Sequence, residues 1–388
     1  MKPVGRVIPG PVSRHLVLAA AAALAFVAPG RAGPVDAEAH RLNELALRLM
    51  HDQRWPEARR TLEEAIAREP DEPVLVRNLA AACAKEGDQL REAGDDSAAL
   101  ELLDRAVRLH PGRVSYRLLR GIARFGIARD AERFFARQDF AAVLAVDPDL
   151  TAALYYAGLL AYQERRLEEA VRDFEHALRI DAEAEGVRAW LERARRELDV
   201  ERRYTELRGA QFLIRHGPDF PPSAASRVLD TCEQAYGDLC PVLEHYPETV
   251  TVVTLYAPSG FRAATRLHPW VAGLSDGTIR LTVRSPVDPE SLRGTIYHEF
   301  AHHLIRGIAP RVPGWIHEGI AQRAEGRDVG VAESRLRRER NLSAAELSIG
   351  ILRQPDPRAV RRFYDLALAF TSFLHRTGGD AAILAVLH

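Results

Sequence analysis

The chain has 388 residues, of which 47% are hydrophobic, 28% charged and 7% aromatic. This composition is that of a soluble globular protein rather than a disordered or fibrous one, and the length favours two domains. The 53 basic and 54 acidic side chains leave a formal net charge of -1, and no basic block is interleaved with aromatic residues, so we expect no nucleic-acid partner.

The first 32 residues have the layout of a secretory signal peptide. Three basic residues, the last of them Arg14, precede an apolar run at 16–27, and small residues suitable for cleavage follow up to Ala32. A bilayer core requires about 20 apolar residues in a helix, so this run is too short to span one. A buried or anchoring helix is the alternative. We expect an exported protein, periplasmic or secreted, with no stable membrane span after cleavage of residues 1–32.

Residues 36–200 consist largely of helix formers and carry one pattern four times. Small residues one and two turns apart let a second helix approach closely, a larger residue fills the gap, and proline ends the helix. The four occurrences are Ala58, Leu62, Ala65 and Pro70; Ala99, Leu103, Ala106 and Pro111; Ala136, Phe140, Val143 and Pro148; and Ala170, Phe174, Ala177 and Ala182.

This order resembles that of the second helix of tetratricopeptide repeats, which recur every 34 residues. The four starts are separated by 41, 37 and 34 residues, so the first interval requires seven extra residues, which we expect as two helical turns around 89–96. The resemblance implies an α-helical solenoid whose concave face commonly binds peptides, and hence a protein partner. A generic helical bundle is the alternative.

The pattern changes after the repeats. Residues 188–208 mix acidic and basic side chains and suggest a solvated helix or linker, which places the domain boundary near residue 205. Strands are expected at 210–216 and 249–256. A third run, at 277–284, is either an exposed sheet edge to which an extended peptide could add, or an internal strand.

The segment 223–240, between the first two expected strands, is expected to be helical. On one continuous helix Cys232 and Cys240 would lie about 12 Å apart, too far for a disulfide, whereas a break at Gly237 would let them pair. Buried apolar thiols are the simpler expectation, because three cysteines are too few for a disulfide scaffold.

The segment His298-Glu299-Phe-Ala-His302 is the most informative part of the chain. Residues four apart lie on one face of a helix, so the two histidines can present imidazole nitrogens to one metal ion. Glu299 follows the first ligand and can serve as a general base without binding the metal. Glu318 lies sixteen positions after His302 and completes a His, His, Glu set that leaves a fourth metal position open, as catalytic zinc requires.

Together with Trp315-x-x-Glu318-Gly319-x-Ala321, this motif resembles the gluzincin metallopeptidases, specifically the thermolysin-like catalytic domains of the peptidase MA type. The resemblance covers about residues 206–388 and implies an α+β fold. It further implies Zn²⁺ bound by His298, His302 and Glu318, with Glu299 polarising the attacking water.

Four further positions bear on this resemblance. Tyr364 resembles the downstream tyrosine that donates to the oxyanion in these enzymes, and a core or interface tyrosine is the alternative. Gln322 stands where thermolysin has an acid that orients a zinc-bound histidine, so that support must come from another residue. We expect His303 and His317, which adjoin ligands in sequence, to be outer-sphere or surface residues rather than ligands.

The sequence thus predicts an α-helical, tetratricopeptide-like solenoid at 36–200 followed by an α+β thermolysin-like catalytic domain at 206–388. The function expected is that of an exported zinc peptidase acting on a peptide or protein substrate, with the repeats recruiting a protein partner or that substrate. No Gly-x-Met-Glu-Asn segment typical of aminopeptidases occurs, so an endopeptidase is the default. The alternative is a repeat-based binding or assembly protein whose metallopeptidase-like domain is inactive.

Overall fold

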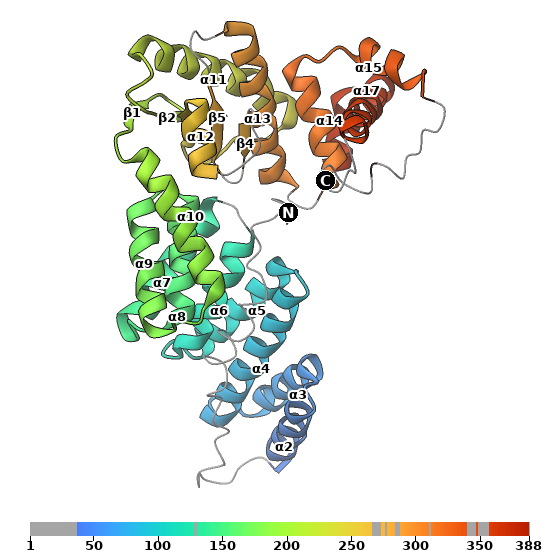
Figure 1. The fold of residues 1–388 in the computed structure, drawn as a ribbon. Coiled ribbons are helices and arrows are strands. Elements are labelled where there is room, and N and C mark those ends of the chain that lie inside the picture. Colours follow the sequence, from blue (N-terminus) through green and yellow to red (C-terminus); the bar gives the residue numbers. More distant parts are fainter. Residues whose placement is uncertain are drawn as a thin grey trace. The chain divides into compact units, whose positions relative to one another are not determined.

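The structure is a computed structural model that describes residues 37–127, 130–265, 273–275, 278–283, 288–309, 312–339, 347 and 357–387. It is mostly helical, with a repeat-like helical solenoid and a mixed sheet (Figure 1). The chain divides into two compact units: most of the solenoid up to residue 191 forms one, and the residues from 192 onward, together with the turn at 163–167, form the other. The expected signal peptide lies outside the described residues, and no described helix has the length and apolarity needed to cross a membrane.

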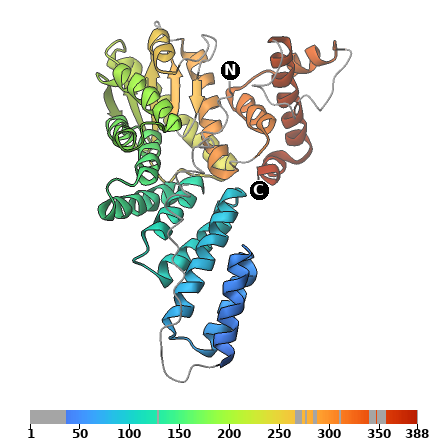
Figure 2. The same ribbon diagram turned by 60° about the horizontal axis from the view of Figure 1, so that its bottom comes forward.

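The solenoid is built from consecutive helices that pack side by side (Figures 1 and 2). The pairs α2 with α3, α4 with α5 and α6 with α7 are in extensive contact, and α3 with α4 and α5 with α6 join neighbouring pairs. The helices are α2 (Ala37–His51), α3 (Trp55–Arg68), α4 (Pro73–Glu92), α5 (Asp96–Leu109), α6 (Val114–Ile127), α7 (Asp130–Val146), α8 (Thr151–Gln163), α9 (Leu167–Ile180) and α10 (Glu185–Glu201).

The recurring sequence pattern corresponds to the buried stripes of α3, α5, α7 and α9. Its small and large apolar positions are exposed by no more than 1%. Glycines in the preceding helices make room for the large residue: an added Cβ would lie 2.9 Å from Leu103 at Gly87, 2.8 Å from Phe140 at Gly121 and 2.6 Å from Phe174 at Gly158. The expectation of stacked helical hairpins is confirmed, because the large residue of one helix fills the space left by glycine in its neighbour.

The irregular first interval has a simple structural cause. Helix α4 has 20 residues, whereas α8, the corresponding helix of the last pair, has 13. The seven extra residues therefore lengthen the first helix of a pair by two turns, as expected, although α4 ends at Glu92 rather than at residue 96.

Residues 188–208 were expected to form a solvated helix or linker; α10 confirms the helix, but this helix is amphipathic rather than solvated on every side. Val187, Leu191 and Ala194 are buried, and Glu197, one turn further on, is fully buried as well. The stripe is hard to recognise in the sequence because two of its positions, Glu197 and Glu201, are acidic. Buried carboxylates of this kind require cationic partners, which only the folded chain brings close.

The second unit contains a five-stranded mixed sheet in the order β1-β2-β3-β5-β4. The strands are β1 (Thr205–Arg208), β2 (Phe212–His216), β3 (Thr251–Tyr256), β4 (Gly273–Ser275) and β5 (Ile279–Thr282). β2, β3 and β5 are parallel, whereas β1 and β4 are antiparallel to their neighbours. The run 277–284 contains β5, which is an internal strand, so the alternative that this run forms a sheet edge is wrong. The edge next to β5 is formed by β4, and neither β4 nor β1 was expected from the sequence.

Helices cover both faces of this sheet. α11 (Pro222–Leu243) and α13 (Pro289–Ile308) pack on one face, where Ile214, Val253 and Leu281 of the strands join the apolar core. The last turn of α10 and the helix α12 (Pro258–Thr265) lie on the other face, beside Tyr256. The unit also includes α14 (Gly314–Glu325), α15 (Val329–Leu336) and α17 (Pro357–Leu387).

A buried cluster of charges joins α10 to its face of the sheet. Arg280 of β5, exposed by 1%, lies 3.0 Å from Glu197, and Arg215 of β2 lies 2.8 Å from Glu201. Arg165, from the turn between α8 and α9, bonds to both carboxylates. Each buried carboxylate therefore has at least two cationic partners, which is what makes its burial tolerable.

Helix α11 is continuous through Gly237. Cys232 and Cys240 are both free and buried, so the buried-thiol expectation is confirmed and the paired alternative is wrong. Burial raises the pKa of both thiols, which keeps them protonated and unreactive.

Candidate metal centre

Two helices bring the expected ligands together. His298 and His302 lie one turn apart on α13, and Glu318 lies on α14, which packs against α13. One nitrogen of each histidine and one carboxylate oxygen of Glu318 are all within 4.8 Å of one another. Within the described part of the chain, these three side chains form the one cluster with such metal-binding geometry.

The donor set fits a divalent cation of the zinc type. The Nε2 atoms of His298 and His302 lie 3.8 and 3.7 Å from the two oxygens of Glu318, so the three groups surround a common point. The Oε2 atom of Glu318 is buried and has no hydrogen-bond partner. A buried carboxylate oxygen without a partner is costly unless a cation faces it, and two imidazoles with one carboxylate suit zinc.

Glu325 orients the first histidine. Its Oε2 atom lies 3.2 Å from Nδ1 of His298, which leaves Nε2 of that ring for the metal. Arg327 holds the other carboxylate oxygen at 2.7 Å. Gly294 of α13 makes room for this carboxylate, because a Cβ there would lie 3.3 Å from Cγ of Glu325. Glu325 was not expected from the sequence, although its position seven residues after Glu318 places both on one helix face.

Gln322 has a different role, which is to join α14 to α17. Its side-chain amide donates to the carbonyl oxygens of Glu318 at 3.2 Å and of Tyr364 at 3.0 Å. A Cβ at Gly319 would overlap Ala367 and Thr371 of α17, so glycine is needed where the two helices approach. These contacts fix the backbone of a ligand and of Tyr364 relative to each other.

Glu299 and Tyr364 both lie at the cluster. Glu299 is only 8% exposed, and its burial raises the pKa of its carboxyl group despite the opposing effect of the two histidines. Burial also raises the pKa of Tyr364, and the nearby carboxylates of Glu318, Glu299 and Glu325 raise it further. The phenol therefore stays protonated and can donate a hydrogen bond.

The pKa values of two members of the cluster shift in opposite directions. Burial alone would lower the pKa of His298, but the hydrogen bond to Glu325 and the charges of Glu299 and Glu318 outweigh it, so the net shift is upward. For Glu318 the reverse holds: burial raises its pKa, but the two histidines outweigh burial and lower it. The cluster thus favours an ionised third ligand.

The two additional histidines do not join the ligand group. The ring of His317 lies 5.7 Å from that of His302, and burial is the main cause that lowers its pKa to about 3, so the ring is neutral. The ring of His303 stacks on Phe300, and its Nε2 atom lies 3.4 Å from the hydroxyl of Thr251 on the sheet. His303 therefore faces the sheet.

Comparison with known proteins gives little further information. No protein-family model matches this chain, and neither does any curated protein sequence. Of 28 matching chains among solved structures, one is described as "MamA RS-1 ArsTM double mutant". It shares 19% sequence identity over 43% of this chain and 99% of its own length, with a TM-score of 0.32.

Proposed function

We propose that this protein is an exported zinc-dependent peptidase of the gluzincin type, with tetratricopeptide-like repeats that recruit a protein partner or substrate. The observation that carries the proposal is that potential ligand atoms of His298, His302 and Glu318 lie close together, and that the buried Oε2 atom of Glu318 has no hydrogen-bond partner. A buried carboxylate, Glu299, directly follows the first ligand, where a general base is needed.

Zinc held by these three side chains would supply Lewis-acid activation of water and of the scissile carbonyl. Glu299 would take the proton of the attacking water and pass it to the departing amine. The raised pKa of Glu299 suits this exchange, because a carboxyl group whose pKa is closer to the working pH both accepts and returns a proton readily. Tyr364 would donate its phenol hydrogen to the developing oxyanion.

The edge of the sheet supports a polypeptide as the substrate. β4 is the edge strand beyond β5 and lies next to α13, the helix that carries both histidines. An extended peptide can add to such an edge through main-chain hydrogen bonds that do not depend on its sequence. This supports hydrolysis within a polypeptide, as an endopeptidase performs it.

Metal analysis and peptide hydrolysis, measured on the same preparations, test the proposal. We expect about one equivalent of zinc in the purified chain. Glu299→Gln should retain the zinc and lose hydrolysis by several orders of magnitude, because it removes the base but no ligand. Glu290→Gln, an exposed carboxylate on the same helix, is the control and should keep both. A wild-type chain without bound metal, or an active Glu299→Gln variant, would exclude this function.

A further inference from the structure

A cavity of about 320 Å³ lies between the end of α15 and the start of α17. Five arginines and two acidic residues surround it, with a single apolar residue, so its formal charge is strongly positive. The lining residues are Arg335, Leu336, Arg338, Glu339, Arg358, Arg361, Arg362 and Asp365. None of them is a ligand or a base of the candidate metal centre.

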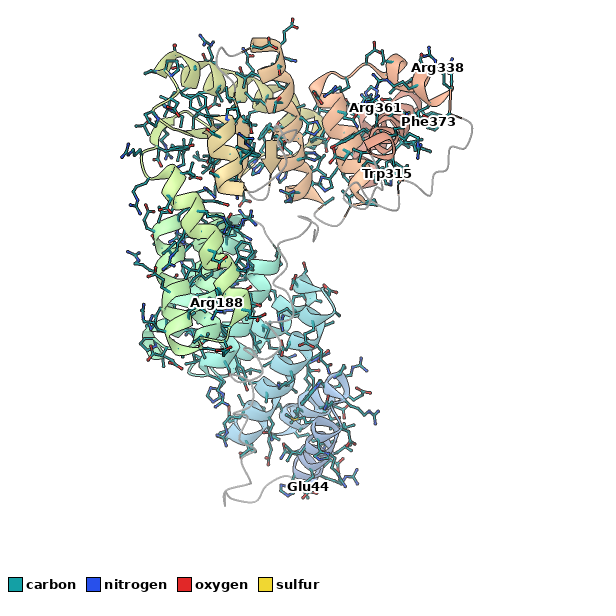
Figure 3. All side chains as sticks on the ribbon, viewed as in Figure 1. Glu44, Arg188, Trp315, Arg338, Arg361 and Phe373 are labelled. Carbon is teal, nitrogen blue, oxygen red and sulfur yellow. The ribbon has the colours of Figure 1, made fainter. Side chains whose placement is uncertain are left out.

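The two acidic residues, Glu339 and Asp365, offset only part of the charge of the five arginines in the lining. Asp365 is 7% exposed, and its carboxylate is held by Arg335 at 3.2 Å. Among the residues that the structure describes, Arg338 and Arg361 form no side-chain hydrogen bond or ion pair, although the charge of Arg361 acts on Asp365, and both arginines are exposed (Figure 3). Two guanidinium groups are therefore available to a ligand, beside an arginine that an internal carboxylate already fixes.

The local backbone adds to the positive potential. α17 begins at Pro357, so Arg358, Arg361 and Arg362 lie in its first two turns. The first turn of a helix has amide groups without helical partners and carries a partial positive charge. Leu336 is the only apolar residue in the lining. The chemistry of the cavity suits a compact anion with several oxygens.

Among such anions, a phosphate group matches the cavity best. Guanidinium groups bind phosphate oxygens in pairs of parallel hydrogen bonds, and a tetrahedral group with up to two charges can be met by several arginines at once. A carboxylate carries one charge and two oxygens in one plane, so an acidic peptide would have to place several side chains in the same small volume. We propose that this cavity binds a phosphate group, carried either by a free phosphate compound or by a lipid headgroup.

Calorimetric titration of the full chain with inorganic phosphate and pyrophosphate tests the site. Arg338→Gln combined with Arg361→Gln should reduce affinity by roughly tenfold or more, because two charge-assisted contacts are lost. The matched control is Arg337→Gln combined with Arg376→Gln, which removes the same charge from exposed arginines outside the cavity. If the double variant at Arg338 and Arg361 bound phosphate with the same affinity as the control double variant, the phosphate would bind elsewhere, for instance at bound metal, and the proposal would be overturned.

Two further measurements identify the source of the phosphate. Vesicles containing phosphatidic acid are compared with vesicles of equal surface charge that contain oleic acid. Variant-sensitive binding to the phosphatidic acid vesicles indicates a lipid headgroup, and binding of the free compounds alone indicates a soluble ligand; either supports the proposal. Failure of both, or tighter variant-sensitive binding of a polyglutamate peptide than of phosphate, would refute it. None of these readouts depends on peptidase activity.

Discussion

The hydrogen bond between Glu325 and His298 makes a quantitative prediction about metal affinity. Replacing Glu325 with Gln keeps the size of the side chain and removes its charge, so the 3.2 Å contact to Nδ1 loses its ionic character. The amide can also turn its NH₂ group toward the ring, which would favour the wrong tautomer of His298. Outer-sphere partners of this kind typically contribute about 10- to 100-fold to metal affinity.

The expected effect on zinc binding is therefore a loss of about 1.4–2.7 kcal/mol. The measurement is a zinc titration against a competing chelator, with Arg327→Gln as a second variant. Arg327 touches only the other oxygen of Glu325 at 2.7 Å, so its loss should have a smaller effect than Glu325→Gln.

An unchanged zinc affinity in a folded Glu325→Gln variant would refute this reasoning. It would mean that the ring of His298 is held by the packing of α13 alone. Glu290→Gln provides the control for the change in net charge, since that carboxylate is exposed near the start of the same helix.

Three other predictions concern stability and pH. Gly158→Ala should destabilise the solenoid by about 1–3 kcal/mol in urea unfolding, because the new Cβ would meet Phe174. Gly237→Ala, where a new Cβ would have no atom within 4 Å, should be neutral or stabilising, and equal effects of the two substitutions would contradict the packing argument. Arg280→Met should cost about 3–5 kcal/mol by leaving Glu197 buried with fewer cations, and an unaltered melting temperature would exclude this. Because the pKa of the first histidine ligand is raised without metal, protons should compete with zinc from a higher pH than at an ordinary histidine. As the pH is lowered, zinc affinity should then fall by about tenfold per pH unit for each proton that zinc must displace. A zinc affinity that stays constant between about pH 8 and pH 5 would be inconsistent with this ligand.

The features that the sequence predicted well are those set by neighbours along the chain. The repeat stripes depend on spacing within one helix, so Ala58 or Phe174 could be assigned to the core before any partner was known. The same holds for His298 and His302, because four residues of helix suffice to align them. The two added helical turns were expected for the same reason, although α4 ends at Glu92 rather than at residue 96.

The features that were missed depend on contacts between distant segments. Helix α10 seemed solvated because Glu197 is charged, and the burial of this carboxylate depends on Arg165 and Arg280, which are distant from it in the sequence. Strand β5, within the run 277–284, could not be assigned to an edge or an interior without β4, which pairs with it on the side away from β3. Glu325 lies 27 residues from His298, so its role required knowledge of how α13 and α14 cross.

The buried charges of α10 also limit how this chain can be divided. A fragment cut at residue 205, where the regular elements change from helix to strand, would keep Arg215 and Arg280 but discard Glu197 and Glu201. Arg165, which bonds to both carboxylates, precedes the cut by still more residues and belongs to the same compact unit. The sheet-containing unit is therefore not a cassette that recombination could transfer intact from its first strand onward, and an inherited rearrangement would have to carry α10 and the turn before α9 with it.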